Sequence, residues 1–174
     1  MENTIRINRL LPVIWGFLVM TLISIAPLIN FINLFFCAGI ILGGVAGVMS
    51  FNKQLTVLNV PLTFKDAVLI GILSGVLSAV AVSGFNIITL MYSSANPVTE
   101  SLKMLGEFGM NLPPEVNKQL DKLADEFNKY GYSPTLAIFT FLSNLIIYPL
   151  FGAAGALLTA AIINNKKKNN SSTV

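Results

Sequence analysis

Long apolar runs dominate this chain and alternate with shorter polar stretches. The four runs are Leu10 to Ala26, Phe31 to Phe51, Ala67 to Tyr92, and Pro134 to Ile163. A helix needs about 20 residues to cross a hydrocarbon core of roughly 30 Å, and apolar runs of about 18 or more are candidates to span it. The pattern therefore predicts an all-α polytopic membrane protein with four transmembrane helices arranged as two hairpins.

Turn and capping residues mark where these helices begin. The stretch Pro27 to Asn30 separates the first two runs, and because proline cannot continue a helix and asparagine favours turns, it predicts a tight helical hairpin. Thr63 and Asp66 have the spacing of a capping box ahead of the third run. Ser133 followed by Pro134 is typical of the first turn of a helix, so the third and fourth helices have well-marked starts.

The first run is short for a membrane span and has a second interpretation. Arg6 and Arg9 precede it, and it ends in the small-x-small sequence Ser24-Ile25-Ala26, which is the arrangement of a cleaved signal peptide. Cleavage would leave Pro27 as the first mature residue, an awkward backbone for a cleavage site, and a second apolar run follows almost at once. We therefore expect the first helix to be retained.

The polar segment between the third and fourth runs predicts two amphipathic helices within residues 97–130, joined at Gly109 to Leu112. Apolar residues recur there every three or four positions, which places them on one face of a helix. In the first helix these residues are Val98, Leu102, Leu105 and Phe108. In the second helix they are Val116, Leu120, Leu123, Phe127 and Tyr130.

The distribution of lysine and arginine predicts the orientation. Positive residues near helix ends are retained on the cytoplasmic side. They occur in the first segment, in the loop Asn52 to Asp66, and in a basic tail over residues 164–174, whereas the short loop between the first two runs has none. Both termini should therefore be cytoplasmic and the amphipathic insert extracytoplasmic, with residues 1–174 forming a single membrane domain.

Small residues at four-residue spacing predict helix-packing faces, because small side chains let helix backbones approach closely in lipid. We expect packing inside the bundle, with homo-oligomerisation or docking to a membrane protein partner as the alternative. The predicted packing residues are Gly39, Gly43, Gly47, Gly71, Gly75, Gly152 and Ala156.

Polar residues inside the third and fourth runs are candidates for a polar pathway. They are Ser78, Asn86, Thr89 and Asn144. The alternative interpretation is that they form interhelical hydrogen bonds, each worth roughly 1 kcal/mol. Pro149 in the fourth run removes one backbone hydrogen bond and predicts a kink.

The residue types that membrane enzymes use are missing from the runs. The chain has no histidine, Cys37 is its only cysteine, and charged residues are 11% of the chain and lie outside the apolar runs. Catalysis, metal binding and ion-coupled pumping in a membrane usually need such groups. We therefore expect no enzymatic activity and no cofactor. The net charge of +3 comes from cations beside the runs, which does not indicate nucleic acid.

The order of these features resembles small, uncharacterised four-helix bacterial membrane proteins of the domain-of-unknown-function kind. The resemblance covers most of the chain and implies a bacterial origin, an inner-membrane location and no assigned functional residue. It is carried by Pro27 to Asn33, Cys37-Ala38-Gly39, Gly43-Gly44, Asp66 to Gly75, Asn96-Pro97, and Gly152 to Lys167.

The sequence favours a non-enzymatic accessory or structural membrane component that packs with itself or with a partner in the lipid bilayer. A small transporter or channel for an uncharged or small solute is the alternative. A third hypothesis places the stripe from Val116 to Tyr130 in the outer headgroup layer. Its net acidic polar face opposes contact with anionic lipid, so folding over the mouth of the bundle is favoured.

Overall fold

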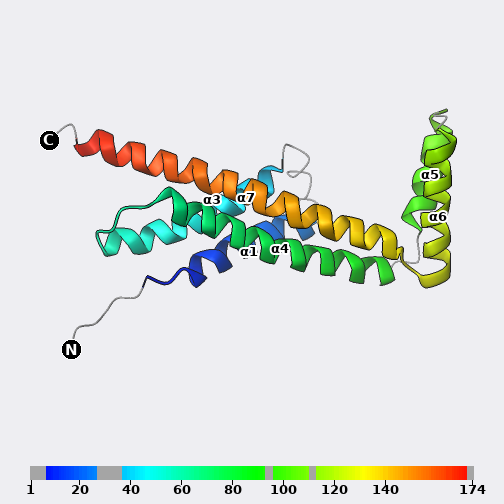
Figure 1. The fold of residues 1–174 in the computed structure, drawn as a ribbon, viewed down its shortest axis with the longest axis horizontal. Helices are drawn as coiled ribbons and strands as arrows, with labels where there is room; N and C mark the ends of the chain where they lie inside the picture. The colour runs from blue at the N-terminus through cyan, green and yellow to red at the C-terminus, as the bar shows by residue number, and fades with distance from the viewer. Residues whose placement is uncertain (1–6, 27–36, 93–95, 110–112, 172–174) are drawn as a thin grey trace. The chain divides into compact units, whose positions relative to one another are not determined.

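Six helices account for most of the residues that the structure, a computed structural model, describes, namely 7–26, 37–92, 96–109 and 113–171 (Figure 1). The expected all-α class is confirmed, and no strand occurs in these four ranges. The helices are α1 (Leu10–Ile25), α3 (Ala38–Val57), α4 (Phe64–Tyr92), α5 (Pro97–Glu107), α6 (Pro114–Tyr130) and α7 (Pro134–Ser171).

Three of these helices, α3, α4 and α7, are long and apolar enough to cross a membrane. The apolar helix α1 has 16 residues, which at 1.5 Å per residue gives a length of about 24 Å. The hairpin predicted at Pro27 to Asn30, and the beginning of the run that starts at Phe31, lie outside the described residues. Helix α3 continues beyond Phe51 to Val57, because Leu55 is buried in the core.

Contacts divide the chain into two compact units. The first, called here the bundle unit, comprises Met1–Val82 and Asn144–Val174, and the second, called the hairpin unit, comprises Ser83–Ser143. Both α4 and α7 contribute residues to each unit.

In the bundle unit, α1 and α4 begin at the same end. Arg9, which precedes α1, forms a 2.7 Å salt bridge with Asp66 in the first turn of α4. At that end Asn164 of α7 donates a 3.2 Å hydrogen bond to the carbonyl of Leu62, in the loop between α3 and α4. Helices α3 and α7 therefore end on the side of the bundle unit where α1 and α4 begin. Helices α3 and α7 run in one direction, and α1 and α4 run in the opposite direction.

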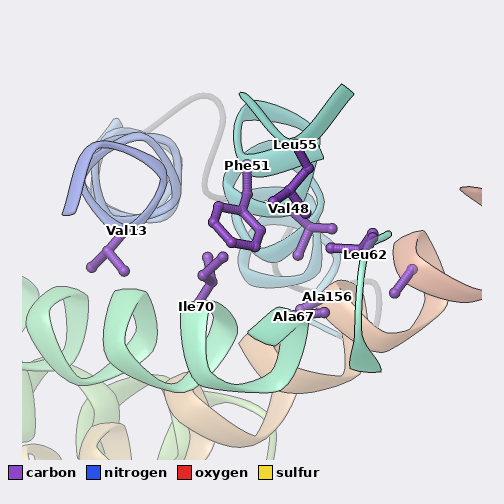
Figure 2. Packing of buried hydrophobic residues seen from close by; sticks show 9 residues of the cluster. Val13, Val48, Phe51, Leu55, Leu62, Ala67, Ile70 and Ala156 are labelled. Atoms are coloured by element: carbon purple, nitrogen blue, oxygen red, sulfur yellow. The ribbon is translucent and has the colours of Figure 1, made fainter. Parts of the chain in front are cut away.

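Side chains from all four helices of the bundle unit meet in one buried cluster. Figure 2 shows Phe51 of α3 and Ile70 of α4 pointing toward each other, and Val13 of α1 pointing toward α4. Burial from water contributes about 25 cal/mol per Å² of apolar surface, and between helices in lipid the same contacts stabilise through van der Waals packing. The cluster comprises Val13, Val48, Phe51, Leu55, Leu62, Ala67, Ile70, Ala156 and Ala160.

The two predicted helix starts are confirmed. The Thr63 hydroxyl accepts a 3.1 Å hydrogen bond from the Asp66 amide and donates a 2.8 Å bond to the Asp66 carboxylate. Asp66 thus reaches back to the Thr63 side chain, which differs from the backbone contact of a standard capping box. The Ser133 hydroxyl accepts a 3.1 Å bond from the Leu136 amide, and Pro134 is the first residue of α7.

Candidate functional site

Helices α3, α4 and α7 approach one another through glycine backbones in the bundle unit. A Cβ atom added to Gly71 would lie 2.5 Å from the Gly152 carbonyl oxygen, and one added to Gly152 would lie 2.7 Å from the Gly71 carbonyl oxygen. A Cβ on Gly44 would overlap the same Gly152 carbonyl. No larger residue fits these three positions without moving a backbone.

A second set of close glycine contacts joins α1 to α3. A Cβ on Gly43 would lie 2.9 Å from the Gly16 carbonyl oxygen, and one on Gly16 would lie 3.1 Å from the Gly43 carbonyl oxygen. A Cβ on Gly47 would lie 3.1 Å from the carbonyl oxygen of Pro12. The short helix α1 is therefore seated directly on the backbone of α3.

The sequence-predicted packing residues all lie in the interior of the bundle unit. Gly75 lies against the Pro149 backbone of α7, where an added Cβ would be 2.6 Å from the Pro149 nitrogen. Gly39 and Ala156 are buried as well. Three glycines at such helix contacts were not predicted: Gly16, Gly44, and Gly155, whose added Cβ would overlap the Ile41 carbonyl oxygen of α3. Four-residue spacing could not identify Gly44, because it adjoins Gly43 and points toward a different helix.

Two serines one turn apart on α4 bind the backbone of α1. The Ser74 hydroxyl donates a 3.0 Å hydrogen bond to the carbonyl of Val13, and the Ser78 hydroxyl donates a 3.2 Å bond to the carbonyl of Phe17. Both serine side chains are fully buried. Ser78, which the sequence placed in a polar pathway, thus has an interhelical partner.

The hairpin unit contains a cavity of about 240 Å³ between its part of α4 and its part of α7. The polar lining residues are Ser83, Asn86, Thr89 and Thr140. The apolar lining residues are Ile87, Leu90, Leu136 and Ala137. Of the four predicted pathway residues, the structure brings Asn86 and Thr89 together here. Ser78 and Asn144 belong to the bundle unit and do not line this cavity.

Helices α5 and α6 lie side by side as a helical hairpin (Figure 1). Asn96 organises it in two ways. Its Oδ1 atom caps α5 by accepting hydrogen bonds of 3.1 and 3.3 Å from the amides of Val98 and Thr99. Its Nδ2 atom donates a 3.2 Å bond to the Ala124 carbonyl of α6. One side chain therefore both starts α5 and attaches it to α6.

The apolar stripe of the hairpin is buried only in part. Near Asn96, Val98 and Phe127 are buried, with exposed fractions of 7% and 6%. Leu120 and Leu123 are half-buried, whereas Val116 at the beginning of α6 and Tyr130 at its end are exposed. Phe108, the last residue of the first stripe, is 76% exposed. The helix ends near the α5–α6 connection thus present the uncovered apolar side chains of Phe108 and Val116.

The Glu126 carboxylate joins α6 to the first turn of α7. It accepts hydrogen bonds from the Ser133 hydroxyl, from the Thr135 hydroxyl at 2.6 Å, and from the Thr135 amide at 3.1 Å. These bonds, that from Ser133 first, lower the pKa of the Glu126 carboxyl below its ordinary value of 4.5. A carboxylate at a helix N-terminus is also favoured by the helix dipole.

The described residues hold no group of three or more histidine, cysteine, aspartate or glutamate side chains that could bind a metal ion. No family model, curated protein or solved structure matches this chain. The class that the fold defines is an all-α protein with three helices able to span a membrane.

Proposed function

We propose that this protein is a four-span integral membrane protein of a bacterial inner membrane, with both termini cytoplasmic. We further propose that it acts as a non-enzymatic scaffold: the bundle unit is a rigid anchor, and the hairpin formed by α5 and α6 contacts a partner outside the cytoplasm.

The packing of α1 supports a fourth span in place of a cleaved signal peptide. Pro12, Gly16 and Met20 are buried, and the carbonyls of α1 accept the Ser74 and Ser78 hydrogen bonds. Removing α1 would leave those hydroxyls without these partners inside the bundle, which costs free energy in an apolar medium. Local thinning of the bilayer or snorkelling of the flanking residues accommodates a short span.

The placement of charge supports a cytoplasmic location for both termini. Arg9 and Lys65 adjoin the beginnings of α1 and α4, and Lys53 and Lys167 lie near the ends of α3 and α7. These helix ends share one side of the bundle unit, as the Arg9–Asp66 and Asn164–Leu62 contacts require. Cations retained on the cytoplasmic side therefore converge at a single face.

One observation carries the scaffold proposal: the backbones of α3, α4 and α7 are in contact around Gly152. Small residues in membrane helices serve close packing, and here they fill the centre of the bundle unit with backbone instead of lining a water path. Ser78 is bonded to α1. A transporter or channel remains the second candidate, favoured by the presence of Asn86 and Thr89 at one cavity.

Membrane insertion and orientation are tested by cysteine labelling in intact cells. The background variant is Cys37→Gly, because Cys37 has a φ of 55°, a left-handed conformation that glycine adopts at no steric cost. Lys118→Cys in α6 should react with a membrane-impermeant maleimide in intact cells. Lys167→Cys in the tail should react only after lysis. The reverse pattern, or release of the chain by alkaline carbonate, contradicts the proposed topology.

The scaffold and a channel whose path includes Ser78 make opposite predictions for this buried position. In the same background, Ser78→Cys should stay unlabelled from both sides of the membrane if the bundle unit is packed. Labelling of Ser78→Cys by a small water-soluble methanethiosulfonate, blocked by a transported solute, would support the channel. Lys118→Cys serves as the control for reagent activity.

Contact with a partner is tested by photo-crosslinking in living cells. A benzophenone amino acid at Phe108 or Met104, both exposed and apolar, should give one discrete protein adduct. The matched control is the same amino acid at the exposed polar position Lys118. Adducts of one size at Phe108 and none at Lys118 support the scaffold. Absence of any protein adduct at Phe108 and Met104 contradicts it.

A further inference from the structure

The cavity of the hairpin unit has walls suited to an apolar ligand. Ile87 and Leu90 of α4 and Leu136 and Ala137 of α7 supply its apolar surface, and no charged residue lines it. A cavity of about 150 Å³ with apolar walls already stays dry and binds benzene. The present cavity of about 240 Å³ has room for a larger apolar group.

The surface around the cavity is apolar on both helices. Phe85, Ile88 and Met91 on α4, and Ile138 and Phe139 on α7, are all exposed large apolar side chains. Scattered apolar residues are normal on the surface of a soluble protein, but a contiguous exposed set marks a surface that contacts lipid or another protein. In a membrane-spanning helix such side chains contact lipid. The cavity therefore opens toward the acyl chains of the bilayer.

The cavity also has polar side chains, which lie where the polar end of a lipid molecule could bind. Asn86 forms no hydrogen bond with any residue in the described ranges, and its amide is exposed. The Thr89 hydroxyl donates to the Phe85 carbonyl at 2.9 Å, which leaves its oxygen able to accept. Thr140 lies on the opposite wall. The Asn86 amide nitrogen is a hydrogen-bond donor that suits an ester carbonyl at the head of an acyl chain, because an ester oxygen only accepts.

We propose that the cavity between Asn86 and Thr89 of α4 and Ala137 of α7 binds one acyl chain of a membrane phospholipid, with the ester group at Asn86. This site rests on the proposed membrane location. It does not depend on the scaffold role, because a bound lipid is compatible with either a scaffold or a channel.

The test uses the full chain in lipid nanodiscs that contain phosphatidylethanolamine with a diazirine in mid-chain. After illumination and digestion, adducts should concentrate on residues 83–90 and 136–140 relative to the other exposed apolar helix faces. Ala137→Phe, which fills the cavity, should reduce these adducts roughly tenfold, the change that 1.4 kcal/mol of lost affinity produces. The matched control is Ile138→Phe, because Ile138 is 62% exposed and does not line the cavity.

Two further variants keep the test decisive if Ala137→Phe fails to give a monodisperse protein. Leu90→Ala enlarges the cavity and should increase adducts on residues 136–140, and Asn86→Leu should lower labelling by the phospholipid. Uniform labelling of all exposed helix faces, unchanged by the three variants, overturns the site. Labelling by free diazirine palmitate but not by the phospholipid overturns the phospholipid assignment. Carbonate release of the chain overturns the membrane location itself.

Discussion

The backbone of Gly71 in α4 contacts the backbone of Gly152 in α7, and neither residue has space for a methyl group facing the other. Gly44 of α3 lies against the same Gly152 carbonyl. Three helices therefore meet at one residue, which makes this crossing sensitive to added volume.

Gly71→Ala should destabilise the protein by about 1–3 kcal/mol, the cost of overpacking a close contact. The added Cβ would lie 2.5 Å from the Gly152 oxygen and 2.8 Å from the Ala153 Cα, and both are backbone atoms that cannot rotate away. The measurement is thermal unfolding in detergent followed by circular dichroism.

Gly84→Ala, on the same helix, is the matched control. A Cβ at Gly84 meets nothing within 4 Å, and alanine is favoured over glycine inside a helix by roughly 1 kcal/mol. This variant should be neutral or slightly stabilised. Equal effects of the two substitutions would contradict the glycine contact.

Ser74→Ala should loosen α1 from the bundle. The substitution removes a buried hydrogen bond to the Val13 carbonyl, worth roughly 0.6–1 kcal/mol between membrane helices. Hydrogen exchange of residues 13–20 should accelerate. Thr89→Val, which removes a hydroxyl bonded within its own helix to Phe85, should leave that exchange unchanged, and an equal effect would argue against an α1–α4 bond.

Protonation of Glu126 should release α6 from the beginning of α7. Hydrogen bonds from Ser133 and Thr135 lower the pKa of this carboxyl in the folded protein. Because the folded-state pKa lies below the unfolded one, the stabilisation is fully present above the ordinary pKa of 4.5. It is lost as the pH falls through the lowered folded value.

The measurement for Glu126 is hydrogen exchange of the Thr135 amide against pH, corrected for the intrinsic exchange rate. The wild-type amide should lose protection below pH 4.5, the ordinary value for this carboxyl. Glu126→Gln should already have low protection at neutral pH. Asp125→Asn, one residue away on the same helix, is the control and should follow the wild type. A pH-independent wild type would refute the contact.

Two substitutions at Asn96 should separate its two roles. Asn96→Asp keeps an oxygen that accepts from the Val98 and Thr99 amides but loses the donor to Ala124. It should preserve α5 and weaken its attachment to α6. Asn96→Ala loses both, and a lost N-cap costs about 1 kcal/mol. Hydrogen exchange over residues 97–107 should therefore rise more for alanine than for aspartate, and identical profiles would show that the cap has no role.

Local signals in the sequence were sufficient for the beginnings of α4 and α7 and for the two amphipathic helices. Thr63 and Ser133 were identifiable because capping depends on residues three positions apart in the chain. The amphipathic helices α5 and α6 followed from the spacing of their apolar residues. The ends of α3 and α7 were less predictable, since packing of Leu55 extends α3 through the polar residues Asn52 to Gln54.

The sequence alone determined that the chain is all-α, that its long helices are apolar, and that glycines recur on their faces, because these properties depend on residue type and spacing. Only the tertiary structure decided the partners. Gly44 meets Gly152, Ser78 binds the carbonyl of Phe17, and Asn86 lines a cavity apart from Ser78. Spacing defines a face of a helix but not what lies opposite it, since that depends on where two helix axes, far apart in the chain, cross.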